Sequence, residues 1–231
     1  MKDYLNIAEA KKMFCFVAEE MVKQEGYLTE MDIPIGDGDH GRNMHMAFSE
    51  IQAELPRMRC TSIEDVFQAV GTIIMDFCGG ASGVLFGTLF VSGTVHRQKH
   101  FTMTLVDFAE IFRVSLDALK SRGKAKPGDK TMIDALEPAV CAFEKCSEEN
   151  DSLPAGLVKA AAAAKQGMES TRNMEAHSGR AKYYPDKGLG LQDPGATSIW
   201  IIFQAMADWA ALQEWKSQDL DCQVTTLTLN P

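Results

Sequence analysis

The sequence is poor in the features that mark several large classes of protein. Only six of its 231 residues are cysteine, and they form neither a CxxC pair nor a zinc-finger spacing. Apolar runs of about 18 residues, long enough to cross a membrane, do not occur, and the N-terminus has no apolar run typical of a signal peptide. We therefore expect a cytoplasmic protein with reduced thiols and no membrane partner.

A basic surface is also lacking. The formal net charge is −9 and the pI is near 5.1, whereas binding to a nucleic-acid backbone needs a positively charged face. We therefore expect no nucleic-acid partner, and a phosphate ligand would need a local reversal of charge. Apolar residues make up 45% of the chain, which is typical of a globular protein with one sizeable core.

Convincing strand patterns are scarce, while apolar residues recur three and four positions apart along most of the chain. This spacing predicts a series of helices, and the loops between them are of modest length. The pattern therefore predicts an all-α bundle or ring. No repeat or linker divides the chain, and we expect one domain over residues 1–216 with a C-terminal tail at 217–231. The eight predicted helices cover residues 6–25, 42–55, 62–78, 83–98, 104–121, 131–147, 154–176 and 196–216.

Three aspartates, Asp32, Asp37 and Asp39, fall within eight residues of one another. Carboxylates this close repel and would take up protons without a cation between them, and Mg²⁺ and Ca²⁺ prefer such oxygen ligands. The interspersed proline and glycines favour a tight loop that turns the side chains inward. An EF-hand is excluded because Arg42 and Phe48 would stand where Gly and Glu are required. A solvated acidic turn with helix caps is the remaining alternative.

Two glycine-rich segments precede predicted helices, and helix N-termini attract anions. His40-Gly41-Arg42-Asn43 follows the aspartates, and His40 could act as a phosphate ligand, a base or a phosphoryl acceptor, or it could only hydrogen-bond the loop. Gly79-Gly-Ala-Ser-Gly83 would let backbone N–H groups approach a ligand closely. The same five residues could equally form a tight turn between helices.

Two further loops carry positive charge. Residues 121–131 contain three lysines and one arginine, but Asp129 separates Gly128 from Lys130 and a helix precedes the segment, so it is no Walker motif. It is either a basic patch or a solvated charged turn. In residues 179–195, Arg180 could hold a phosphate with two hydrogen bonds. Together the four loops place carboxylates, N–H groups and cations at helix ends, as phosphoryl transfer requires.

These four motifs, in this order between about residues 5 and 213, resemble the nucleotide-binding L subunit of dihydroxyacetone kinases. The resemblance implies a barrel-like ring of eight antiparallel helices with the nucleotide at one end. It implies that Asp32, Asp37 and Asp39 hold two Mg²⁺ ions, which grip the phosphates of ADP or ATP, and that Arg180 stabilises charge during transfer. The implied nucleotide contacts are His40, Gly41, Arg42, Asn43, Ala81, Ser82, Gly123, Met132, Arg180, Asp193, Pro194 and Gly195.

The resemblance also implies an activity shared between subunits. Bound ADP would accept a phosphoryl group from a phosphohistidine on an M subunit of the phosphotransferase system, and would pass it to dihydroxyacetone on a K subunit. The chain shows only the L-like part, so it is expected to need these partners; a homodimer is a further option. Three alternatives stay open: an ATP-dependent subunit for a related ketose such as a ketotetrose, an ADP-loaded partner of a transcriptional regulator, and a helical scaffold with a structural cation.

Overall fold

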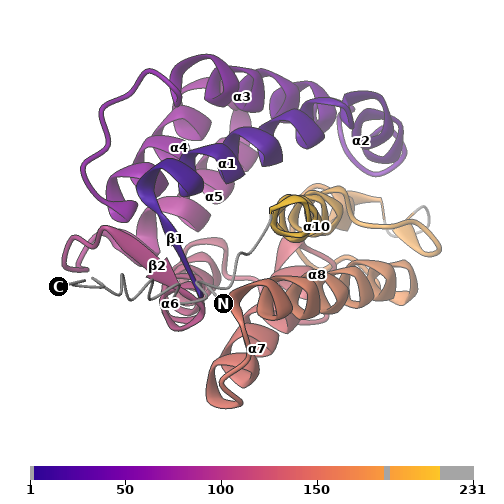
Figure 1. Cartoon of the computed structure of the whole chain (residues 1–231). Helices are drawn as coiled ribbons and strands as arrows, with labels where there is room; N and C mark the ends of the chain where they lie inside the picture. The colour runs from indigo at the N-terminus through magenta and orange to yellow at the C-terminus, as the bar shows by residue number, and fades with distance from the viewer. Residues whose placement is uncertain (1–2, 185–187, 214–231) are drawn as a thin grey trace, which may run out of the picture.

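The structure, a computed structural model, describes residues 3–184 and 188–213. Over these residues the helices form a closed ring in which each contacts the next, from α1 through α3, α4, α5, α6, α7, α8 and α10 back to α1 (Figure 1). Their bounds are α1 Ile7–Val22, α2 Glu25–Asp32, α3 His40–Glu54, α4 Ile63–Phe77, α5 Gly80–Val91, α6 Leu105–Gly123, α7 Met132–Glu148, α8 Leu153–Ser170 and α10 Pro194–Leu212.

The predicted all-α ring is confirmed, because each of the eight predicted helices corresponds to a helix of this ring. Their ends differ by several residues: the segment expected at 83–98 begins at Gly80 and ends at Val91, and the one expected at 154–176 ends at Ser170. Residues 214–216 of the last predicted helix, and the whole tail at 217–231, lie outside the described residues. The boundaries of the domain stay a prediction.

The core of the ring is a connected set of phenylalanines contributed by separate helices. The ring of Phe67 in α4 lies 5.0 Å from Phe14 in α1 and 6.1 Å from Phe112 in α6, measured between centroids. Phe112 in turn lies 5.2 Å from Phe203 in α10. All four side chains are at most 1% exposed, and each such burial contributes about 1.5–3 kcal/mol to the free energy of unfolding. This packing fixes the helix ends that surround the site.

Two elements of the structure differ from the sequence-based expectation. Helix α2 was not among the predicted helices, and it packs against α3 and α10 outside the ring. Strands β1 (Tyr4–Asn6) and β2 (Thr102–Thr104) pair antiparallel with Leu5 opposite Met103, although no strand was expected. The 3-10 turns are η1 Ser92–Thr94, η2 Thr171–Asn173 and η3 Ala181–Tyr183. None of the described helices combines the length and hydropathy that crossing a bilayer requires.

Candidate functional site

The three aspartates converge at one end of the ring. Each of Asp32, Asp37 and Asp39 offers a carboxylate oxygen, and these oxygens lie within 4.8 Å of one another. Burial and the neighbouring Asp37 raise the pKa of Asp39 above its ordinary value, the effect expected of crowded like charges. Asp39 is the N-cap residue of α3 but makes no side-chain capping bond. The alternative in which these carboxylates serve as helix caps therefore fails for Asp39.

The local fold that gathers the carboxylates depends on glycine. A Cβ at Gly36 would lie 1.9 Å from Oδ1 of Asp32, so the chain after α2 folds directly back onto that carboxylate. A Cβ at Gly41 would lie 2.2 Å from the carbonyl oxygen of Glu25, so the first turn of α3 packs against α2. The expectation of a single loop needs correction at one position, because Asp32 is the last residue of α2. Only Asp37 and Asp39 belong to the connecting loop.

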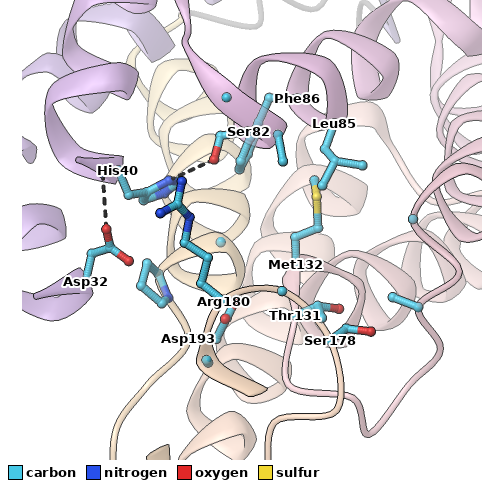
Figure 2. Close-up of a pocket in the computed structure, with 18 of the residues that line it drawn as sticks. Asp32, His40, Ser82, Leu85, Phe86, Thr131, Met132, Ser178, Arg180 and Asp193 are labelled. Atoms are coloured by element: carbon cyan, nitrogen blue, oxygen red, sulfur yellow. Dashed lines mark hydrogen bonds between the residues drawn. The ribbon is translucent and has the colours of Figure 1, made fainter. Parts of the chain in front are cut away.

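His40 joins three helices at the wall of the site (Figure 2). Its backbone N–H donates to Asp32 Oδ2 at 3.3 Å, and its ring is hydrogen-bonded to Ser198 Oγ at 2.8 Å and to Ser82 Oγ at 3.5 Å. Burial lowers the pKa of the imidazole below its ordinary value. Both ring nitrogens have partners, so His40 connects α3 to α5 and α10, and its role toward a ligand stays a prediction.

A cavity of about 340 Å³ extends from the aspartates. Its polar end is bordered by the three carboxylates, Ala81 and Ser82 at the start of α5, and Arg180. Its other end is apolar, and Figure 2 shows Leu85 and Met132 pointing toward each other there. The apolar residues of the lining include Leu85, Leu119, Ala125, Met132 and Ile133, together with Phe86, whose ring lies beside His40. An amphipathic cavity of this size suits a small molecule with one charged and one apolar end.

Two later segments, the start of α10 and the loop that carries Arg180, also border the cavity. Asp193 caps α10 by accepting a hydrogen bond from the Ala196 N–H at 2.7 Å, and burial raises the pKa of its carboxyl group to about 7. Pro194 and Gly195 follow in the first turn and border the cavity. Arg180, whose side chain is 63% exposed, forms an ion pair with Asp37 across the mouth. The guanidinium group therefore lies beside the carboxylate cluster.

Most of the residues expected at the site meet around this cavity. They are Asp32, Asp37, Asp39, His40, Asn43, Ala81, Ser82, Gly123, Met132, Arg180, Asp193, Pro194 and Gly195. Gly41 and Arg42 do not border it, because Gly41 packs on α2 and Arg42 is exposed.

The residues that sequence reasoning missed fall into two groups. Leu85 stands one helical turn after Ala81, so the helical period could have placed it on the same face. Ser198 lies 158 residues from its partner His40, and no local pattern indicates it. The basic patch expected in residues 121–131 also needs correction, since Lys124 and Lys126 are exposed but Lys130 is only 1% exposed.

An all-α domain with an acidic cluster and glycine turns around one amphipathic cavity defines a class of small-molecule-binding domain. The chain belongs to the DAK2 domain family, which matches residues 34–208. It is 41% identical over 181 residues to the "PEP-dependent dihydroxyacetone kinase, ADP-binding subunit DhaL" of Escherichia coli K12, covering 78% of this chain and 86% of that relative. The resemblance to the L subunit is thereby confirmed.

Two larger proteins show similarity over part of their length. The chain is 33% identical over 193 residues to mouse "Triokinase/FMN cyclase", covering 83% of this chain and 33% of that protein. The crystal structure of the dihydroxyacetone kinase from C. freundii in complex with AMP-PNP and Mg²⁺ matches with a TM-score of 0.69 and 27% identity, covering 87% of this chain and 34% of that one. This chain thus spans about a third of the length of both proteins.

Proposed function

We propose that this chain is the nucleotide-binding subunit of a dihydroxyacetone kinase. In this proposal, bound ADP accepts a phosphoryl group from a phosphohistidine protein of the phosphotransferase system, and the group passes to dihydroxyacetone on a K-type partner. The observation that carries the proposal is the cluster of three carboxylates within 4.8 Å at the polar end of an amphipathic cavity. The similarity to ADP-binding subunits over 78% of the chain supports it.

The residues present suit both magnesium and a nucleotide. Three carboxylates that offer oxygens to a common point are the donor set that a hard divalent cation prefers. The cavity volume of about 340 Å³ falls in the roughly 300–1,000 Å³ range of small-molecule sites. Mg²⁺ held by Asp32, Asp37 and Asp39 would neutralise phosphate charge; the resemblance implies two such ions. The apolar end would receive the base.

The chain's own groups would then orient the phosphates. The first residues of α5 carry backbone N–H groups that have no partner within the helix, and Ala81 and Ser82 border the polar end of the cavity. Arg180 brings a permanent positive charge to the same end, where it would stabilise the charge that moves with the phosphoryl group. No residue of this chain needs to form a covalent intermediate.

A partner protein is part of the proposal, and the mouth of the site offers apolar side chains for it. Ile33, next to Asp32, is 62% exposed, and Tyr183, three residues after Arg180, is 71% exposed. A large contiguous apolar patch marks a surface that another protein covers, and in this proposal the two side chains would belong to such a patch. A K-type subunit docked here would bring its bound ketone to the phosphates and exclude water from them.

A coupled assay with a purified K-type subunit tests the proposal. We expect dihydroxyacetone phosphate to form when phosphorylated M-type protein is the donor, and Arg180→Met to lower kcat while ADP stays bound. Arg57→Met is the matched control, because Arg57 is exposed just after the C-terminal end of α3 and its ion pair in the described structure is with Glu54. Product formed from ATP without the M-type protein would favour an ATP-dependent kinase. No product with either donor would overturn the proposal.

A further inference from the structure

Lys130 is a fully buried lysine beside the cavity. Lys130 is only 1% exposed, and its ammonium group donates to the carbonyl oxygens of Thr171 and Leu191, both at 2.5 Å. These two carbonyls belong to different segments: Thr171 begins η2 after helix α8, and Leu191 stands two residues before Asp193, the N-cap of α10. One side chain therefore ties three segments together.

The burial of this ammonium group carries a cost that the surrounding groups offset. Burial lowers the pKa of Lys130 below its ordinary value, while the negative charges of Asp193 and Asp134 oppose that change. Lys124 and Lys126 lie in the same loop and stay exposed, so the loop does not require its cations to be buried. A charged group buried in a protein is costly unless hydrogen bonds and opposite charges compensate it, and Lys130 has both.

The segments that Lys130 joins are linked to one another by further hydrogen bonds. The Gly190 N–H donates to the carbonyl oxygen of Arg172 at 2.8 Å, and the Arg172 guanidinium donates to Gln192 Oε1 at 2.9 Å. The Asp193 N–H donates to Thr171 Oγ1 at 3.0 Å. These contacts form a polar web behind one wall of the cavity, which we call the α8–α10 web: Thr171, Arg172, Gly190, Leu191, Gln192 and Asp193.

Lys130 connects that web to the other part of the same wall. Lys130 borders the cavity, and so do the next two residues, Thr131, which is the N-cap of α7, and Met132. Lys130 itself has a φ of 58°, in the left-handed region, which is uncommon for a residue other than glycine. The backbone that presents Thr131 and Met132 is thus held in an unfavourable conformation by a side chain anchored in the α8–α10 web.

We propose that Lys130 is a positioning residue for the nucleotide. Its ammonium group fixes the start of α7 against the loop before α10, so that Met132 and Asp193-Pro194-Gly195 form one rigid wall of the cavity. The aspartate cluster stands at the end of α2 and in the loop that leads to α3, outside the segments that Lys130 joins. Loss of the ammonium group should therefore loosen the nucleotide without loosening the metal. This inference rests on the proposed function.

The experiment compares Lys130→Met with the wild type in two binding measurements on folded protein. Calorimetric titration with ADP in excess Mg²⁺ should show a dissociation constant raised roughly tenfold or more, because one buried and one part-buried carbonyl lose a charged donor. Titration with Mn²⁺ alone, followed by electron paramagnetic resonance, should show metal affinity within about twofold of the wild type. A merely structural role would weaken both or neither. Lys130→Arg keeps the positive charge and should recover part of the ADP affinity.

Arg113→Met is the matched control. Arg113 also joins two elements, since its Nε donates to Glu144 on α7 at 2.6 Å, but it does not border the cavity. This variant should lower stability and leave the ADP affinity unchanged. If Lys130→Met does not fold, Arg172→Met tests the same wall, because Arg172 is exposed and its guanidinium holds Gln192. It should weaken ADP binding by a smaller factor.

The outcomes separate this inference from the proposed function. If wild-type protein binds no ADP with Mg²⁺, the proposed function fails, and the inference fails with it. If the wild type binds ADP and a folded Lys130→Met binds it equally well, the inference alone is overturned. Unchanged ADP affinity in Arg172→Met, when Lys130→Met is unfolded, would overturn it in the same way.

Discussion

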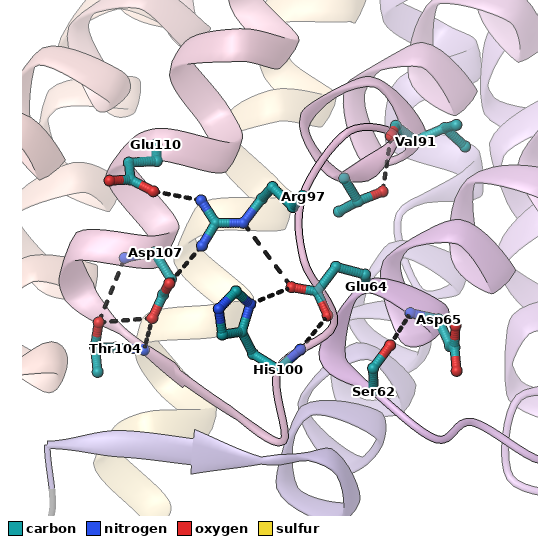
Figure 3. A network of polar contacts seen from close by, with 10 residues as sticks. Ser62, Glu64, Asp65, Val91, Arg97, His100, Thr104, Asp107 and Glu110 are labelled. Atoms are coloured by element: carbon teal, nitrogen blue, oxygen red, sulfur yellow. Dashed lines mark hydrogen bonds and ion pairs between the residues drawn. The ribbon is translucent and has the colours of Figure 1, made fainter.

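Carboxylates lie close together in two places in the protein, and the two clusters differ in how far the chain's own cations neutralise them. At the cavity, Asp32, Asp37 and Asp39 lie together, and the ion pair of Arg180 with Asp37 is the one that the described structure shows there. The second cluster consists of Glu64, Asp107 and Glu110. Arg97 forms ion pairs with all three, and the ring of His100 is hydrogen-bonded to Glu64 at 2.9 Å (Figure 3). There the chain supplies its own cations.

The pKa directions follow this difference. Burial raises the pKa of Asp39, and its neighbour Asp37 raises it further. Burial also acts to raise the pKa of Glu64, but hydrogen bonds from His100 overcome it, and the net pKa is lowered. Charges that the chain neutralises itself stabilise the fold, whereas charges left crowded at a cavity mouth are available to a ligand.

The largest effect that this comparison predicts is on ligand binding. Asp37→Asn removes one carboxylate from the cluster and should weaken binding of ADP with Mg²⁺ by more than the roughly 10- to 100-fold that loss of an outer-shell metal partner costs. The same change relieves repulsion, so the free energy of unfolding of the ligand-free protein should change by less than about 1 kcal/mol. Calorimetric titration and urea unfolding measure the two quantities. An unaltered ADP affinity in Asp37→Asn would contradict the view that the cluster at the cavity, unlike the second cluster, serves ligand binding.

The next effect is on stability at the second cluster. Arg97→Met leaves Glu64 and Asp107 without their shared cation and should lower the free energy of unfolding by about 3 kcal/mol, the low end for breaking a buried pair, because the Asp107 side chain is still 21% exposed. ADP binding should not change. Glu110→Gln is the matched control: Glu110 is 59% exposed, so it should cost under about 1 kcal/mol. Urea unfolding measures both variants. Equal losses of unfolding free energy in the two would show that burial of the carboxylates does not determine the strength of these ion pairs.

The smallest effect concerns pH. Because the folded-state pKa of Glu64 lies below its ordinary value of 4.5, its contribution to stability is present above pH 4.5 and is lost as the pH falls through the folded pKa. Glu64→Gln should therefore flatten the decline of stability below that pH relative to the wild type. Urea midpoints measured from neutral pH down to the acid limit test this. Parallel curves for the two proteins would show that His100 does not bias the titration of Glu64.

Much of the ring could be predicted from the sequence because helices repeat a local pattern. The apolar spacing identified each helix that closes the ring. Helix α2 was not predicted because only Leu28 and Asp32 of its eight residues are buried. Two buried positions are too few to show the apolar spacing of a helix. Strands β1 and β2 are three residues each, and their pairing joins segments that no short window contains.

The candidate site also contains residues that the sequence could identify and residues that it could not. The aspartates could be identified because their crowding is visible in eight consecutive residues. The burial of Lys130 could not, since its partners Thr171 and Leu191 lie 41 and 61 residues away, and in the sequence it resembles its exposed neighbours. The contacts of Ser198 with His40 likewise depend on the closure of the ring. Functional residues that lie close together in the sequence can be predicted from it, whereas residues that only packing brings together cannot.

The most direct measurement is a calorimetric titration of metal-stripped protein with ADP, with and without Mg²⁺. If the acidic cluster is a magnesium site that fastens the phosphates, ADP should bind tightly only when Mg²⁺ is present, and the dependence should vanish in Asp37→Asn. Equal ADP affinity in EDTA and in Mg²⁺ would contradict the account.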